Sequence, residues 1–91
     1  MASILIGYDL NKEEGSEGYK ELFAAIKNLG IWWHCLDSTW IVKSDLTTVE
    51  IRNLLTPHLD PNDELLVAKL SGEAAWVGFN DECSKWLTNN L

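Results

Sequence analysis

Residues 3–10, SILIGYDL, constrain the fold more than any other part of the chain. The segment is typical of a short β-strand, and it is apolar on both faces because Ile4, Leu5 and Ile6 are consecutive. Such a strand has to be covered on both sides. It ends in Tyr8 and Asp9, so it delivers one carboxylate to an end of a sheet, where ligands, metals and partners commonly bind.

The length of 91 residues predicts one domain that spans residues 1–91. A net charge of −7, with seven scattered basic residues, argues against nucleic acid as the main ligand, because phosphate neutralisation needs clustered Lys and Arg. The charge also keeps a small protein soluble. The apolar runs are far shorter than the roughly 20 residues of a membrane span, and no signal peptide is seen. We therefore expect a cytoplasmic protein without membrane contact.

The first half of the chain predicts a helix and then a hairpin. A helix is expected over residues 16–29, with Ser16 as its N-cap and Gly30 just beyond its end. Residues 31–36 and 39–43 are rich in aromatic and β-branched side chains and flank an Asp-Ser turn, which predicts two antiparallel strands.

The second half predicts another helix, a strand and a final helix. Thr47 and Glu50 form the pattern of a capping box, so the second helix begins there. Residues 64–70 predict a strand that is apolar on both faces. Residues 73–79 fit a short strand or a helical turn, and we favour the strand. Asn80 or the next residue caps the final helix.

This order predicts the α+β class and a ferredoxin-like βαββαβ sandwich, with a short extra strand and a C-terminal helix. Two helices would cover one face of a four-stranded sheet. The other face is also expected to be apolar, and a second copy with two-fold symmetry is its simplest cover. Five tryptophans are many for this length, and we expect them in the core and at the dimer interface rather than as base-stacking platforms. The expected interface residues are Ile6, Tyr8, Trp33, Trp40 and Trp76.

The two cysteines, Cys35 and Cys83, are predicted to be reduced thiols of a cytosolic protein. Neither has a second Cys or a paired His at zinc spacing. His34 and His58 have no recognisable triad partner, so we expect structural or exposed roles for them.

Short motifs along the chain resemble a known superfamily. Tyr8-Asp9-Leu10 is similar to the Y-D-I end of the first strand in small CRISPR-associated ferredoxin-fold proteins that partner the adaptation integrase, and in virulence-associated protein D ribonucleases. The hairpin Asp37-Ser38-Thr39-Trp40 resembles their Q-S-aliphatic-aromatic pattern. The whole-chain pattern GYDL, WWH, LDSTWIVK, DELLV and KLSGEAAW is most similar to small bacterial and phage proteins of the SinR family, whose function is not established.

The resemblance implies a face-to-face dimer with Asp9 near its axis. In some members this position holds a divalent metal and supports phosphodiester cleavage, for which Mg²⁺ or Mn²⁺ is suited. Ser38 matches the hairpin serine, which implies a contact to a phosphate or a metal-bound water. Position 37 is Asp where those proteins tend to have Gln.

Two functions of different classes follow. The first is an acidic homodimeric module that binds another protein, such as a phage or defence-system modulator acting on a basic or nucleic-acid-handling partner, without a cofactor. The second is a metal-dependent endonuclease with Asp9, and Ser38 beside it, as catalytic residues. The net charge and the lack of a basic cluster favour the binding module.

Overall fold

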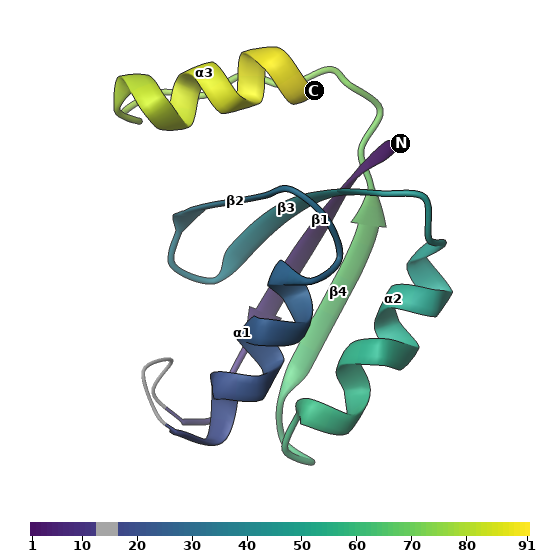
Figure 1. Ribbon diagram of the computed structural model, residues 1–91. Coiled ribbons are helices and arrows are strands. Elements are labelled where there is room, and N and C mark those ends of the chain that lie inside the picture. The colour runs from purple at the N-terminus through teal and green to yellow at the C-terminus, as the bar shows by residue number, and fades with distance from the viewer. Residues whose placement is uncertain (13–16) are drawn as a thin grey trace.

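The computed structural model describes residues 1–12 and 17–91, which form one antiparallel sheet with helices on both faces (Figure 1). The strand order is β2-β3-β1-β4, and each neighbouring pair is antiparallel. The predicted α+β class is confirmed.

The strands are β1 (Ala2–Asp9), β2 (Trp32–Leu36), β3 (Thr39–Ser44) and β4 (Glu64–Lys69). The helices are α1 (Lys20–Lys27), α2 (Thr48–Leu55) and α3 (Asp81–Asn90), with 3₁₀ turns η1 (Glu17–Tyr19) and η2 (Thr56–His58).

Helices α1 and α2 cover one face of the sheet and enclose the larger core. The alternation of β1 points Ile4, Ile6 and Tyr8 into this core, where Ile6 is fully buried. The helices and the neighbouring strand supply the other buried members, which are Tyr19, Leu22, Ile26, Trp40, Val42, Ile51 and Leu55.

Helix α2 begins where the sequence predicts it. The Thr47 hydroxyl accepts a hydrogen bond from the Glu50 backbone N–H at 3.1 Å, and the Glu50 carboxylate accepts one from the Thr47 N–H at 3.0 Å. This reciprocal pair satisfies two N–H groups that the first turn leaves without helical partners. The capping box is confirmed.

Helix α1 is shorter than the expected range of residues 16–29. It follows the 3₁₀ turn η1 and ends at Lys27, with Asn28 as its C-cap. The predicted cap Ser16 lies outside the described residues. Leu22 and Ile26, four positions apart on one face of the helix, are both buried.

Gly30 allows the chain to turn from α1 into the hairpin. Its φ is +155°, and a Cβ at this position would overlap the backbone carbonyl oxygen of Lys43. That carbonyl belongs to β3, whose Lys43 N–H donates to the Ile31 carbonyl at 3.0 Å, so it is held in place.

We expect Gly30→Ala to lower the free energy of unfolding by about 1–3 kcal/mol, because the backbone has to shift to admit a methyl group. Urea unfolding followed by tryptophan fluorescence measures the change. Gly72→Ala is the control, since its φ of +97° carries the strain but no atom lies within 4 Å of the added Cβ. Equal losses in the two variants would show that the contact with Lys43 has no effect.

Helix α3 covers part of the opposite face of the sheet. Leu87 of α3 packs with Trp33 of β2 and Ile41 of β3 in a second, smaller core. The helix begins where its Asn80 cap is predicted, and the Asn80 side-chain oxygen accepts from the Cys83 N–H at 2.8 Å. Figure 1 shows α3 on its own, away from α1 and α2, with residues 70–80 leading to it from the end of β4. We call residues 70–80 the connecting segment.

Two predictions about this part of the chain are wrong. Residues 73–79 form no strand, since none of them belongs to a ladder. Residues 73–78 are exposed, and Phe79 packs edge-on against Trp33 with a centroid distance of 5.1 Å. Cys35 and Cys83 are not reduced thiols. They form a disulfide with a Cα–Cα distance of 6.4 Å that joins β2 to α3. The folding of α3 onto the sheet brings together cysteines that are 48 positions apart.

Candidate functional site

The adjoining ends of β1 and β4 carry two carboxylates on one face of the sheet. Asp9, the last residue of β1, lies opposite Glu64, the first residue of β4. Both residues are exposed, and with Gly7 and Leu66 they line a shallow hollow of about 400 Å³. Within residues 1–12 and 17–91, neither carboxylate has an ion-pair partner. We call this pair the acidic end.

The hairpin turn that contains Ser38 lies beside the same end of the sheet. The Ser38 carbonyl accepts a hydrogen bond from the Tyr8 backbone N–H at 3.1 Å. The Tyr8 hydroxyl donates to the carbonyl of Asp37 at 3.4 Å. The structure thus brings the two predicted site residues, Asp9 and Ser38, to one end of the sheet.

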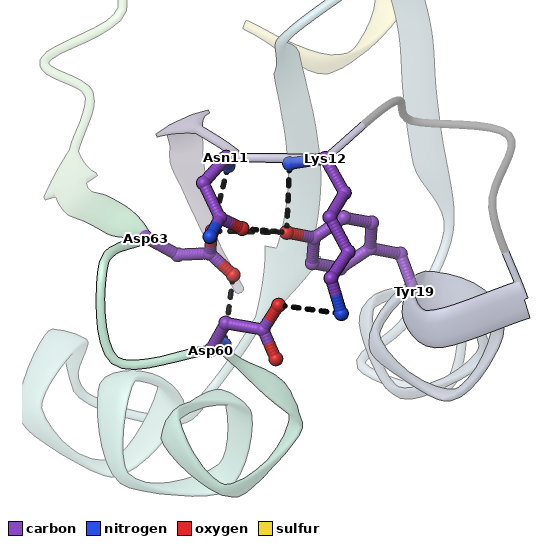
Figure 2. A network of polar contacts seen from close by, with 5 residues as sticks. All are labelled: Asn11, Lys12, Tyr19, Asp60 and Asp63. Atoms are coloured by element: carbon purple, nitrogen blue, oxygen red, sulfur yellow. Dashed lines mark hydrogen bonds and ion pairs between the residues drawn. The ribbon is translucent and has the colours of Figure 1, made fainter.

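A polar network fastens the chain just after β1 to the turn before β4 (Figure 2). One oxygen of Asp63 accepts from the Asn11 N–H at 2.8 Å and from the Tyr19 hydroxyl at 2.9 Å, and its other oxygen accepts from the Asp60 N–H at 2.8 Å. The Lys12 ammonium pairs with the Asp60 carboxylate at 3.0 Å. The structure shows a turn whose carboxylate fixes the loop beside Asp9.

The network changes the proton affinities of its members. Burial acts to raise the pKa of Asp63, but the hydrogen bonds from Asn11, Asp60 and Tyr19 and the charge of Lys12 together outweigh it, so the pKa is lowered. Burial, and then the hydrogen bond to Asp63, raise the pKa of the Tyr19 hydroxyl. The network therefore favours an ionised Asp63 and a neutral Tyr19 at neutral pH.

We expect Asp63→Asn to make the melting temperature less sensitive to acid. A carboxyl whose folded pKa is below its unfolded value of about 3.8 stabilises the fold above that value, and this contribution is lost as pH falls through the folded pKa. The difference in Tm between wild type and the variant should be largest near pH 7 and should shrink below pH 4. Calorimetry across pH 2–7 measures it. A constant difference at all pH values would contradict the assignment.

An apolar groove of about 350 Å³ lies on the sheet face that α3 partly covers. Its floor includes Leu5, Thr39 and Ile41, and the connecting segment and α3 form its walls. Val77 of this wall is 92% exposed, so a large apolar side chain faces solvent. We call this cavity the apolar groove.

The polar atoms of the groove's tryptophans are already bonded within the chain. The Trp33 indole N–H donates to the carbonyl of Cys83 at 3.2 Å. The Trp76 indole N–H donates to the Ser84 hydroxyl at 3.2 Å. The two indoles thus offer the groove only their carbon surfaces.

The residues predicted for a dimer interface fall into three places. Ile6, Tyr8 and Trp40 are buried in the core under α1 and α2, on the other face of the sheet. Trp33 is buried beneath α3. Trp76 alone lies at the surface, 38% exposed, where it lines the apolar groove. The open surface available to a partner is therefore formed by other residues, chiefly Leu66 and Val77, which are 61% and 92% exposed.

The histidines have no place in this site. The His34 ring stacks on Trp40 with a centroid distance of 3.9 Å, and its Nδ1 lies 3.0 Å from the carbonyl of Thr39. His58 Nδ1 lies 3.8 Å from a carboxylate oxygen of Glu21 on the other side of the sheet. In the described part of the chain, no three His, Cys, Asp or Glu side chains gather closely enough to hold a metal ion. A metal held by Asp9 and Glu64 would need further ligands.

Sequence reasoning missed Glu64 as a partner of Asp9, although the signal was present. In an antiparallel neighbour of the first strand, the first residue lies beside the last residue of that strand. The expected strand over residues 64–70 therefore already placed Glu64 at this end.

Two further findings concern membrane crossing and similarity to known families. Among the described residues, no helix combines the length and apolar character that a membrane crossing requires. No model of a known protein family matches the chain.

Proposed function

We propose that the protein is a small acidic module that binds another protein through the face of its sheet on which α3 lies. The observation that carries this proposal is the apolar groove, with Val77 exposed in its wall and Leu66 exposed nearby on the same sheet face, in a chain with a net charge of −7. A grouped exposed apolar surface rimmed by charge is a common mark of an interaction site. The acidic surface favours a basic partner, including one that handles nucleic acid.

The proposal also covers the topology of the fold and an evolutionary relationship to known families. The strand order β2-β3-β1-β4, with α1 and α2 on one face, supports a ferredoxin-like βαββαβ arrangement to which α3 is added. The motifs around Asp9 and Ser38 support kinship with the CRISPR-associated and virulence-associated protein D superfamily, and with the SinR family. A modulator of phage or defence systems would fit this kinship.

Affinity capture tests the binding function. The oxidised protein is immobilised and exposed to a bacterial lysate, and each captured protein is then purified and titrated calorimetrically against the free module. A saturable complex with at least one purified protein is expected, with an affinity that weakens as salt increases. Capture that is never reproduced with a purified partner would contradict the function.

Homodimerisation is a second proposal, and it would use the half of the face that α3 leaves open. Leu5, Leu66 and Ala68 lie together there on β1 and β4. Light scattering at tens of micromolar should then give twice 10.3 kDa, and Leu66→Lys should restore the monomer. A particle of 10.3 kDa at these concentrations would contradict it.

The alternative function is a metal-dependent endonuclease, and one observation favours it. Asp9 and Glu64 oppose each other with no ion-pair partner in the described ranges, so a two-fold axis at this end would gather four carboxylates. Mg²⁺ or Mn²⁺ suits such oxygen ligands. Wild type and Asp9→Asn are compared on labelled RNA and DNA with and without Mn²⁺. Cleavage by wild type alone would make the protein an enzyme, whereas no cleavage by either supports the binding module.

A cytoplasmic location stays a proposal. The Cys35–Cys83 disulfide weighs against this location, because disulfides persist mainly in oxidising compartments. Trapping of free thiols in acid-quenched cells would decide it. Full labelling of both cysteines indicates a reducing compartment, and absence of labelling would contradict the cytoplasmic location.

A further inference from the structure

We propose that the apolar groove and the acidic end form one continuous site for an extended segment of a partner protein. The segment would place an apolar side chain in the groove and, a few residues along, a Lys or Arg at Asp9 and Glu64. This inference rests on the proposed binding function and specifies its ligand.

The two parts of the site join across Gly7. This residue of β1 lies in register with Thr39 on one side and Leu66 on the other. Thr39 lines the groove and Leu66 lines the hollow at the acidic end. Gly7 itself puts no side chain between them, and the nearest side chain is that of Leu5, whose Cδ2 lies 3.6 Å from where a Cβ of Gly7 would be. A bound segment can therefore lie along β1 from Leu5 to Asp9.

The groove selects an apolar group. Its two indole N–H groups are bonded to Cys83 and Ser84, so they have no hydrogen left to donate to a ligand. Val77 and the neighbouring alanines of the connecting segment add only carbon surface. A polar side chain would lose its water here and find few partners besides the Thr39 hydroxyl, whereas an aliphatic or aromatic one would bury apolar area.

The acidic end selects a basic group. Like charges directly opposite each other on neighbouring strands repel, and a cation between them relieves the repulsion. A Lys or Arg side chain supplies that cation and can donate to both carboxylates. This surface overlaps the one proposed above for a homodimer, and a second copy would compete for it as the poorer occupant because it brings another net charge of −7. A small apolar molecule would fill the groove and leave the acidic end unused.

The length of the site fixes the spacing in the ligand. Leu5 and Asp9 are four residues apart on β1, which is about 13 Å at the rise of an antiparallel strand. An extended segment has a similar rise, and the long side chain of Lys or Arg covers part of the distance. The apolar and basic residues should thus be separated by about two to four positions.

A positional peptide library tests this inference. The oxidised protein, immobilised through an added N-terminal tag, is exposed to random decapeptides, and the retained peptides are sequenced. The expected result is enrichment of an aliphatic or aromatic residue followed by Lys or Arg at the stated spacing. A synthetic peptide of the enriched sequence then gives the dissociation constant by fluorescence anisotropy.

Two pairs of variants locate the peptide. Val77→Asp should weaken binding by roughly tenfold or more, because it puts a charge into the apolar wall. Its control, Leu54→Asp, makes the same change at a 52%-exposed position on α2.

Asp9→Asn should weaken binding roughly two- to fivefold and flatten its salt dependence. Its control, Asp45→Asn, removes an exposed carboxylate beyond the end of β3, at the opposite end of the sheet.

Each result supports or overturns the inference. Weaker peptide binding by Val77→Asp and Asp9→Asn, but not by the two control variants, supports the inference. Enrichment of acidic peptides, no enrichment, or equal binding by all variants overturns it. Self-association that Val77→Asp abolishes also overturns it, because a second copy would then be the occupant. If purified partners bind but the variants leave their affinity unchanged, the proposed function stands and this inference fails.

Discussion

Replacing Trp40 with alanine is expected to lower the free energy of unfolding by about 3–5 kcal/mol. The Trp40 side chain is 2% exposed and stacks on Phe23 of α1 with a centroid distance of 5.9 Å. Its indole N–H donates to the buried Tyr8 hydroxyl at 3.0 Å. The substitution thus opens a cavity and removes a hydrogen bond in the largest core. Guanidinium unfolding followed by circular dichroism measures the loss.

Trp32→Ala is the matched control for this substitution. Trp32 lies on the same hairpin and touches Trp40, but it is 42% exposed, so its removal should cost about 1–2 kcal/mol. Trp40→Phe adds a second comparison, because it keeps an aromatic ring beside Phe23 and removes the donor to Tyr8. If Trp40→Ala were no more destabilising than Trp32→Ala, the packing of β3 against α1 described above would be wrong.

Breaking the Cys35–Cys83 disulfide is expected to lower the free energy of unfolding by about 4 kcal/mol, from the entropy of a loop closed over 48 positions. The loss of stability should be greatest in α3, because this helix contacts the rest of the chain through few other groups. The Ser3 hydroxyl and the Lys43 ammonium both donate to the carbonyl of Asn90, at 2.7 and 3.0 Å, and Leu87 packs on Trp33. Amide exchange in α3 and the connecting segment should therefore accelerate first.

Hydrogen exchange with mass spectrometry compares the oxidised protein, the reduced protein and a Cys35→Ser/Cys83→Ser double variant. Reduced and double-variant proteins should lose protection in residues 70–90, while β1 and β3 keep most of theirs. If the reduced protein and the double variant lose protection alike, the effect comes from loss of the disulfide and not from the serine side chains. Uniform loss across the sheet, or no loss in α3, would contradict this prediction.

The elements that local chemistry determines were predictable from the sequence. The capping box of Thr47 and Glu50 places the start of α2, and the apolar run over residues 4–6 identifies β1. Residues 73–79 misled because a short apolar run is compatible with any extended backbone, whether or not it pairs. Whether such a backbone joins a ladder depends on a free strand edge beside it. The connecting segment crosses the sheet face instead and bends at Gly72 and Gly78, both of which have positive φ.

The candidate site was predictable only in part, since it depends on contacts between distant segments. Asp9 was identified from the end of the first strand and Ser38 from the family resemblance, and the structure places both at one end of the sheet. The apolar groove and the disulfide required the position of α3, which no local pattern encodes. One hint was available: Trp33 and Cys35 share a face of β2, and Cys83 belongs to the apolar stripe of the last helix.

The disulfide has a practical consequence for anyone who prepares this protein. The wall of the apolar groove is joined to the sheet at the end of β4 and, further on, by the Cys35–Cys83 bond. Oxidised and reduced molecules have the same sequence and nearly the same mass, so they co-purify, yet only the oxidised form has this wall fixed at both ends. A sample stored in dithiothreitol would drift from one form to the other. Two laboratories could then report different partners for one chain, and a thiol titration beside each binding curve would reconcile them.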